Sequence, residues 1–178
     1  MPNRPTAFVF ACLTLAAASG AQAREKPPEL AGAVEATRAV GAADFRVLFW
    51  PVFRATLWSG DGAFDWAAPF ALSLTYARTF TADQLTDKTV EEMARLTGRG
   101  ANEFTAFGRE FGACIDDVGP GDRITAISVD DEKARLFLNG RQKCTLERPA
   151  LRREFFGIWL SRDSLFPEAT ERLIGSGE

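Results

Sequence analysis

The chain has 178 residues, of which 46% are hydrophobic and 25% charged, and its formal net charge is −3. These values are typical of one globular domain with a sizeable core. The basic residues form no stripe, which excludes nucleic acid as an expected partner. The absence of histidine excludes His-dependent catalytic triads and His-ligated metal sites. We expect no cofactor and no metal, and the composition points to no particular oligomeric state.

The N-terminal segment, residues 1–23, has the pattern of a secretory signal peptide. A positively charged Arg4 precedes an apolar run over residues 6–18, and Ala-Gln-Ala at 21–23 forms an A-x-A cleavage site. The apolar run is too short to span a bilayer comfortably. We therefore expect cleavage after Ala23, a periplasmic or secreted protein, and no stable membrane span after cleavage; an uncleaved anchor is the alternative.

The remaining chain divides into a polar leader, 24–37, expected to be loose, and one domain, 38–178. The stretch FRVLFWPVFRATLW, residues 45–58, has an apolar residue at every odd position, a period of two that predicts one long strand with a buried face. Pro51 cannot donate to a sheet ladder, so we expect a bulge or an edge position there. Residues 69–77 predict a second strand. Its alternation places four large side chains on one side: Phe70, Leu72, Leu74 and Tyr76.

Two helices are predicted next. Thr81 and Gln84 fit a capping box, so a helix is expected to begin there and to continue to about residue 97, before Gly98-Arg99-Gly100. A second helix is expected over residues 102–115. It places one stripe of side chains at helical spacing, which core packing explains: Phe104, Phe107, Phe111 and Cys114.

Period-two alternation returns over residues 122–129, 134–138 and 141–146. Asn139-Gly140 lies between the last two stretches and predicts a tight hairpin. Pro149 and Pro167 suit the first turns of two further helices, the second ending at Gly175. No βαβ alternation occurs. The order of elements therefore predicts an α+β fold with one antiparallel sheet and helices packed on a face.

Three cysteines are present, and cleavage after Ala23 would leave Cys114 and Cys144. In an oxidising compartment this pair could close a disulfide. Alternatively, each cysteine could be a separate buried thiol that packs as a small hydrophobe. Spacing alone leaves both possibilities open, because a bridge requires the two Cα atoms to lie close together.

Few polar residues stand out as candidates for chemistry. Arg46, Tyr76 and Arg78 are the groups best placed to bind an anion, because two cations and a phenol lie on or beside the predicted strands. A structural salt bridge is the alternative role for either arginine. Acidic residues at the predicted turns lack the spacing of a calcium loop.

Six segments, in this order and spacing, resemble the bacterial chalcone isomerase-like family: VLFWPVFRATLW, PFALSLTYARTF, KTVEEM, GDRITAI, FLNGR and FFGIWLSRDSLFPEATERL. The resemblance extends over residues 38–175. It implies an open-faced antiparallel β-sandwich, in which one long sheet is backed by helices. It also implies one of two activities: cofactor-free cyclisation of a flavonoid, as in the plant enzymes, or fatty-acid binding between sheet and helices.

The resemblance places Phe53, Leu85 and Glu92 where the plant enzymes have a threonine, a tyrosine and an asparagine. The arginine of the enzymes corresponds to Arg46 or Arg38. Loss of three polar groups removes the hydrogen bonds that position a substrate. Because two of the replacements are apolar, the pattern favours an apolar ligand over a reactive one.

We therefore expect an exported, non-catalytic protein that binds a fatty acid or another apolar or aromatic small molecule. The predicted ligand-binding residues are Arg46, Trp50, Phe53, Tyr76, Arg78, Leu85 and Glu92. Two alternatives stay open. One is an isomerase or intramolecular lyase of the chalcone isomerase type with another substrate, which would depend on Arg46, Tyr76 and Glu92. The other is a structural or partner-binding protein whose interior is filled by its own side chains.

Overall fold

A computed structural model describes residues 26–31 and 37–175. The strands are β1 (Arg38–Val47), β2 (Trp50–Ser59), β3 (Phe70–Tyr76), β4 (Arg123–Ser128), β5 (Lys133–Leu138) and β6 (Arg141–Glu147). The α-helices are α1 (Ala82–Thr97), α2 (Thr105–Cys114), α3 (Leu151–Leu160) and α4 (Pro167–Ile174), and short 3-10 helices occupy Pro28–Leu30 and Ala101–Phe104. No helix in these ranges is long and apolar enough to cross a bilayer.

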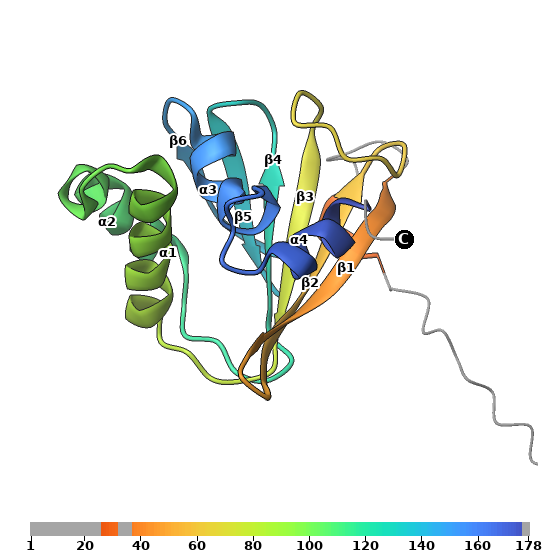
Figure 1. The fold of residues 1–178 in the computed structure, drawn as a ribbon, viewed down its shortest axis with the longest axis horizontal. Coiled ribbons are helices and arrows are strands. Elements are labelled where there is room, and N and C mark those ends of the chain that lie inside the picture. Colours follow the sequence, from red (N-terminus) through yellow and green to blue (C-terminus); the bar gives the residue numbers. More distant parts are fainter. Residues whose placement is uncertain (1–25, 32–36, 176–178) are drawn as a thin grey trace, which may run out of the picture.

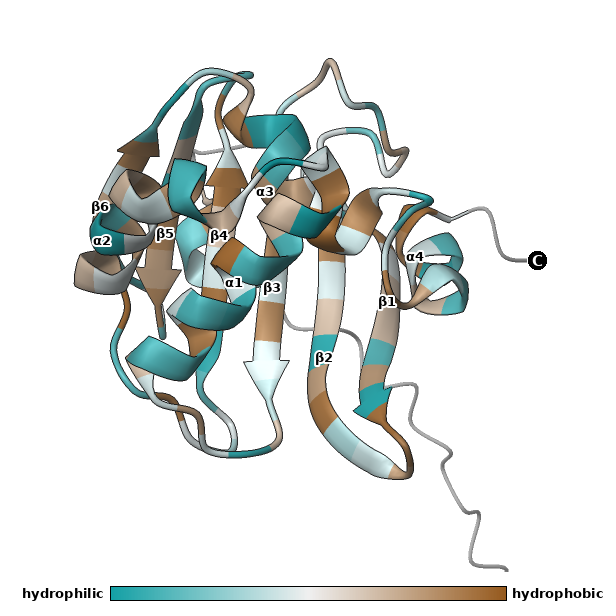
Figure 2. Ribbon diagram, turned by 60° about the vertical axis from the view of Figure 1, so that its left-hand side comes forward, coloured by the Kyte–Doolittle hydropathy of each residue, from teal (hydrophilic) through white to brown (hydrophobic). Residues whose placement is uncertain are grey.

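The strands form one antiparallel sheet in the order β1-β2-β3-β4-β5-β6. The four α-helices pack against one face of this sheet, with α1, α2 and α3 over its β3–β6 part and α4 against β1 (Figures 1 and 2). Neighbouring strands are consecutive in the chain, so each connection joins adjacent strands. The predicted α+β class, with an antiparallel sheet backed by helices, is confirmed.

The prediction of one long strand over residues 45–58 is wrong. The chain reverses at Leu48 and Phe49, and β1 and β2 form an antiparallel hairpin. The turn contains no Gly, Asn or Asp, the residues that normally mark a hairpin, and the preceding residues of β1 are mostly small. The register shifts where Arg46 lies opposite Pro51, so the irregularity expected at Pro51 is present.

Alternation along the strands separates two apolar clusters. Phe70, Leu72, Leu74 and Tyr76 lie on one side of β3, as predicted, and this side faces the helices and joins the main core. The opposite face of the sheet carries a smaller cluster, made of Leu30, Trp58, Ala71, Ile127 and Phe137. Both faces of the central strands are therefore covered.

Residues 26–31 were expected to belong to a loose leader, but they pack on this opposite face of the sheet. Leu30 is fully buried there. The Glu29 carboxylate accepts hydrogen bonds from Thr125 Oγ1 at 2.6 Å and from Arg123 Nη2 at 3.1 Å. Burial raises the pKa of Glu29, but the hydrogen bonds from Thr125 and Arg123 outweigh it and hold the pKa below its usual value. The predicted signal peptide, 1–23, lies outside the described residues.

Helix α1 begins at the predicted capping box. Thr81 Oγ1 accepts a hydrogen bond from the Gln84 amide at 3.2 Å, and Gln84 Oε1 accepts one from the Thr81 amide at 3.0 Å. The helix ends where Gly98 adopts a φ of 67°. Because both ends are defined locally, the bounds of α1 follow closely from the sequence.

The other helices show one departure. Helix α3 begins at Leu151 rather than at Pro149, because Ala150 adopts a φ of 57° and cannot belong to a right-handed helix. Helix α4 begins at Pro167 and is followed by Gly175 in the left-handed conformation, as expected.

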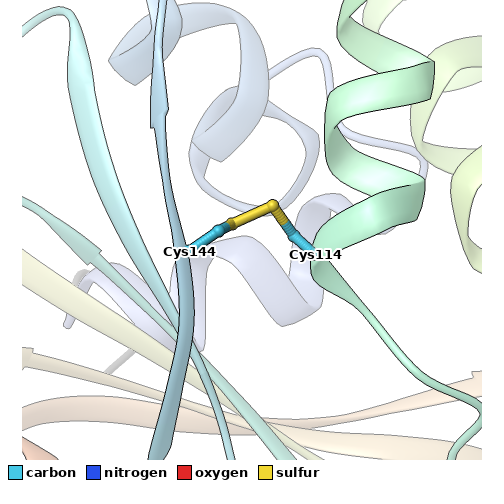
Figure 3. The surroundings of a disulfide bond; sticks show 2 residues. All are labelled: Cys114 and Cys144. Carbon is cyan, nitrogen blue, oxygen red and sulfur yellow. A yellow bond between two sulfur atoms is a disulfide. The ribbon is translucent and has the colours of Figure 1, made fainter.

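Cys114, at the end of α2, and Cys144, in β6, form a disulfide with an S–S distance of 2.01 Å and a Cα–Cα distance of 5.5 Å (Figure 3). Of the two arrangements left open by the sequence, the structure contains the bridge. It ties the end of a helix to the edge strand of the sheet.

Candidate functional site

A cavity of about 310 Å³ lies between the helix-facing side of the sheet and helices α1 and α3. This volume is at the lower end of the range for small-molecule sites. The cavity is lined by Phe45, Val52, Phe53, Leu72, Leu74, Tyr76, Phe80, Gln84, Leu85, Lys88, Thr89, Glu92, Phe111, Ile124, Ala126, Phe155, Ile158, Trp159, Leu165 and Phe166. Strands β1–β4 therefore form its floor, and α1, α2 and α3 with the segment before α4 form its roof.

Aromatic rings make up a continuous part of the wall. Phe45 stacks on Phe53 with ring centroids 4.7 Å apart, and the edge of Phe166 meets Phe45 at 5.3 Å. The Tyr76 ring also packs against the rings of Phe53 and Phe80, with ring centroids 5.9 Å apart in each pair. Such rings bring a large apolar surface together and favour an apolar occupant over water.

The Tyr76 hydroxyl is the polar group contributed by the floor of the sheet. The residue is buried, and burial raises the pKa of its phenol well above the usual value, so the group stays protonated at neutral pH. No hydrogen bond to this hydroxyl is found within the described part of the chain. It can therefore donate one to a ligand.

Glu92 is the buried carboxylate on the α1 side of the cavity. Arg95 Nε donates a hydrogen bond to its Oε2 at 2.8 Å, and Arg95 also donates to the Asp163 carbonyl at 3.0 Å. The Lys88 ammonium lies 3.0 Å from Oε1. That contact has the distance of an ion pair but not the angle of a hydrogen bond, so Oε1 keeps an open acceptor position.

Lys88 brings a positive charge to the edge of the cavity. Partial burial lowers the pKa of its ammonium, but the carboxylates of Glu91 and Glu92 outweigh burial and the net shift is upward. Lys88 is therefore charged at neutral pH. Its side chain is more than half exposed, so its ion pairs are screened by solvent and contribute little to stability.

Four of the seven predicted ligand-binding residues line the cavity: Phe53, Tyr76, Leu85 and Glu92. The three positions at which this chain departs from the plant enzymes are therefore all at the cavity wall. Two of them present apolar side chains, and the third presents a carboxylate already paired with cations.

The other three predicted residues, Arg46, Trp50 and Arg78, do not line the cavity. The reversal at Leu48 carries Arg46 and Trp50 to the exposed tip of the β1–β2 hairpin. The Arg78 guanidinium lies 5.7 Å from the centre of the Trp50 ring. The alternative candidate Arg38 lies at the other end of β1, opposite Ser59.

Lys88 is a charged cavity residue on α1 that the sequence did not identify. It lies three residues after Leu85 and four before Glu92, so the three share one helix face, and this spacing could have identified it. Phe45 and Phe166 were also missed. They meet only because α4 packs against β1, and no local pattern predicts that contact.

Metal binding has no candidate site in the residues that the structure describes, because no group of three or more cysteine or acidic side chains is placed to hold an ion. The polar side chains that line the cavity are the neutral phenol of Tyr76, the partly satisfied carboxylate of Glu92, the ammonium of Lys88, the carboxamide of Gln84 and the hydroxyl of Thr89.

The comparisons with known proteins agree with this architecture. A family model described as chalcone isomerase-like matches residues 63–168, more than half of the chain. A fatty-acid binding protein of Arabidopsis thaliana has a similar solved structure, with a TM-score of 0.62 and 10% sequence identity, over 79% of this chain and 87% of that one. A search of curated proteins gives no match. The chain therefore belongs to the chalcone isomerase-like family.

Proposed function

We propose that this is an exported, non-catalytic protein that binds a fatty acid or a similar apolar carboxylate between sheet and helices. The observation that carries the proposal is the aromatic-walled cavity, which is closed on two sides by packed secondary structure. At about 30 Å³ for each water-sized group, its volume holds on the order of ten such groups. The similarity in fold to a fatty-acid binding protein supports the same assignment.

The charges at the edge of the cavity suit a carboxylate head group near Lys88. Lys88 and Arg95 surround the single buried carboxylate of Glu92, while Glu91 is largely exposed and screened. The Tyr76 hydroxyl can serve as a donor deeper in the cavity. An acyl chain would then contact the rings of Phe45 and Phe53.

Two observations support export. The first 23 residues have the composition and cleavage site of a signal peptide. The two cysteines that would remain after cleavage are bridged, as is common in oxidising compartments. Fractionation of expressing cells followed by N-terminal sequencing tests this part: the exported protein should begin at Arg24, and retention of an intact N-terminus in the cytoplasm would contradict it.

The isomerase or lyase alternative has weaker support. Of the three residues on which it depends, Tyr76 and Glu92 line the cavity but Arg46 does not. The apolar Phe53 and Leu85 occupy positions at which the family enzymes hold a substrate by hydrogen bonds, so little remains to position one. The third alternative, a filled interior, is disfavoured by the cavity itself.

Binding of decanoic acid, measured by calorimetry and native mass spectrometry, tests the proposal. Ile158 on α3 lines the cavity, and Ile158→Trp should fill it and reduce the affinity at least tenfold. The matched control is Ile174→Trp, the same exchange at a partly buried position of α4 outside the cavity. Equal effects of the two variants, or no binding by the unaltered protein, would contradict the proposal.

A second comparison separates head-group recognition from chain binding. Lys88→Gln should weaken binding of decanoic acid by up to about fivefold, because exposed ion pairs contribute little. The same variant should leave the affinity for decanol unchanged. An equal loss for both ligands would show that Lys88 does not contact the carboxylate.

A further inference from the structure

The tip of the β1–β2 hairpin exposes four consecutive apolar side chains, Val47 to Trp50. Leu48 is 85% exposed, Phe49 90% and Trp50 64%. Among the residues that the structure describes, only two other large apolar side chains are exposed, Val129 and Leu165. Figure 2 shows this turn at the lower edge of the molecule, beyond the end of β3. Solvent exposure of such a contiguous set is unfavourable, so it indicates an interaction surface.

The backbone of the turn is also strained. Leu48 has a φ of 55°, a conformation that a bulky residue adopts only with strain. The β5–β6 turn of the same protein uses the ordinary solution, with Asn139 and Gly140 at φ of 50° and 83°. The hairpin at Leu48 therefore combines a strained backbone with exposed apolar side chains.

Two arginines flank the apolar tip. Arg46 precedes it in β1, and the guanidinium of Arg78 lies against the Trp50 ring at 5.7 Å. In the described ranges neither arginine has an ion pair with a carboxylate, whereas Arg54 pairs with Asp44 at 2.9 Å. Both free guanidinium groups can therefore bind phosphate.

The carboxylates of the neighbouring loops are already engaged. Asp117 accepts a hydrogen bond from the Ala82 amide at 2.8 Å, and Asp122 accepts one from the Gly119 amide at 2.7 Å. The donors are neutral amides, so both carboxylates keep their negative charge, and the positive charge at the tip itself comes from Arg46 and Arg78.

We infer that the β1–β2 hairpin docks the protein on an anionic phospholipid bilayer, with Leu48, Phe49 and Trp50 inserted at the interface and Arg46 and Arg78 on lipid phosphates. Apolar residues beside tryptophan and arginine are the typical composition of an interfacial anchor. A protein partner is a poorer match. A standard interface needs roughly 800 Å² on each side, whereas the exposed apolar side chains here, Val47 to Trp50, belong to one convex turn.

The docked orientation would also serve the cavity. Val52, only two residues beyond Trp50, lines the cavity, and so does the half-exposed Leu165. A docked hairpin would therefore hold one wall of the cavity close to the lipid surface. Docking itself requires no ligand, so it can fail or succeed independently of fatty-acid binding.

Co-sedimentation of the full chain with phosphatidylglycerol or phosphatidylcholine vesicles tests the inference. The decisive variant is Leu48→Gly/Phe49→Ser. Leu48 but not Phe49 has positive φ, so Gly-Ser suits this turn and should preserve the hairpin. It should reduce vesicle binding at least tenfold and leave decanoic acid binding unchanged. Val129→Ser, at the opposite end of the sheet, is the matched control and should bind vesicles normally.

A charge variant tests the role proposed for the two arginines. Arg46→Gln/Arg78→Gln should weaken binding to phosphatidylglycerol by about 25-fold, at about fivefold for each arginine, with little change on phosphatidylcholine. Both lipids carry a phosphate, so an equal loss on both would refute the preference for a net negative surface.

Fluorescence gives a local readout that the apolar run at residues 6–18 cannot imitate. Brominated phosphatidylglycerol should quench a component of the emission that Trp50→Phe removes and Trp66→Phe retains. Three results would overturn the inference: quenching that persists in Trp50→Phe, normal vesicle binding by Leu48→Gly/Phe49→Ser, or a dimer in solution that this variant dissociates. The last result would assign the tip to a second copy of the chain.

Discussion

Removal of the Cys114–Cys144 bridge should lower the stability of the protein substantially. The cysteines are separated by 30 residues. With R the gas constant and n about 30, the chain-entropy relation −2.1 − 1.5R ln n gives about −12 cal/mol/K, or about 3.6 kcal/mol at room temperature. In a domain of this size each 1 kcal/mol shifts Tm by about 2–4 °C. We therefore expect reduction of the bridge to lower Tm by about 7–15 °C.

Thermal unfolding followed by circular dichroism, with and without reductant, measures this effect. The variant Cys114→Ala/Cys144→Ala should unfold near the temperature of the reduced protein and should not respond to reductant. A titration of thiols in the native protein provides the complementary check. Two free thiols, or an unchanged Tm after complete reduction, would refute the reasoning.

Three further predictions concern interactions that stabilise the fold. Glu29→Gln should destabilise the protein by about 1–3 kcal/mol at neutral pH, because it weakens the buried hydrogen bonds to β4. The pKa of Glu29 in the folded protein is lowered from 4.5, so its contribution to stability is complete above that pH and is lost as the pH falls through the folded pKa. The free energies of unfolding of the unaltered protein and the variant, measured by urea titration, should therefore converge in acid. A difference that stays constant with pH would contradict this. Gly41→Ala should lower the free energy of unfolding by about 1–3 kcal/mol, because the added Cβ would overlap the Arg172 carbonyl of α4. Gly157→Ala in α3 has room for the Cβ, so it should leave the melting temperature unchanged or raise it. Thr81→Ala should lower the free energy of unfolding by about 1 kcal/mol through loss of the α1 cap, and an unchanged urea midpoint would contradict that role.

The sequence predicted elements whose ends and faces are defined by neighbouring residues. The capping box at Thr81 and the glycine after Thr97 place α1 within a residue of its observed bounds. Alternation in 69–77 correctly placed Leu72 and Tyr76 on the same side of the strand, because successive side chains of a strand point to opposite faces. The Asn139-Gly140 turn was also predicted, since few residues adopt positive φ readily.

The β1–β2 hairpin shows where local information fails. A period of two continues from Phe45 through Leu57 and cannot reveal a reversal at Leu48, since both arms of a hairpin have the same periodicity. The same error affected the candidate site, because Arg46 and Trp50 were expected beside Phe53 along one strand. The reversal places Arg46 and Trp50 at the hairpin tip and leaves Phe53 at the cavity.

Composition and periodicity were sufficient for the fold class, for most helices, and for the apolar character of the interior, because burial and backbone hydrogen bonding act on neighbouring residues. They did not reveal which cation borders the cavity, nor that the Phe166 ring meets Phe45. Lys88 has its position because α1 packs over the sheet, and Phe166 because α4 packs against β1 at Gly41. Such contacts join residues far apart in the chain, so they arise only from the packing of complete elements.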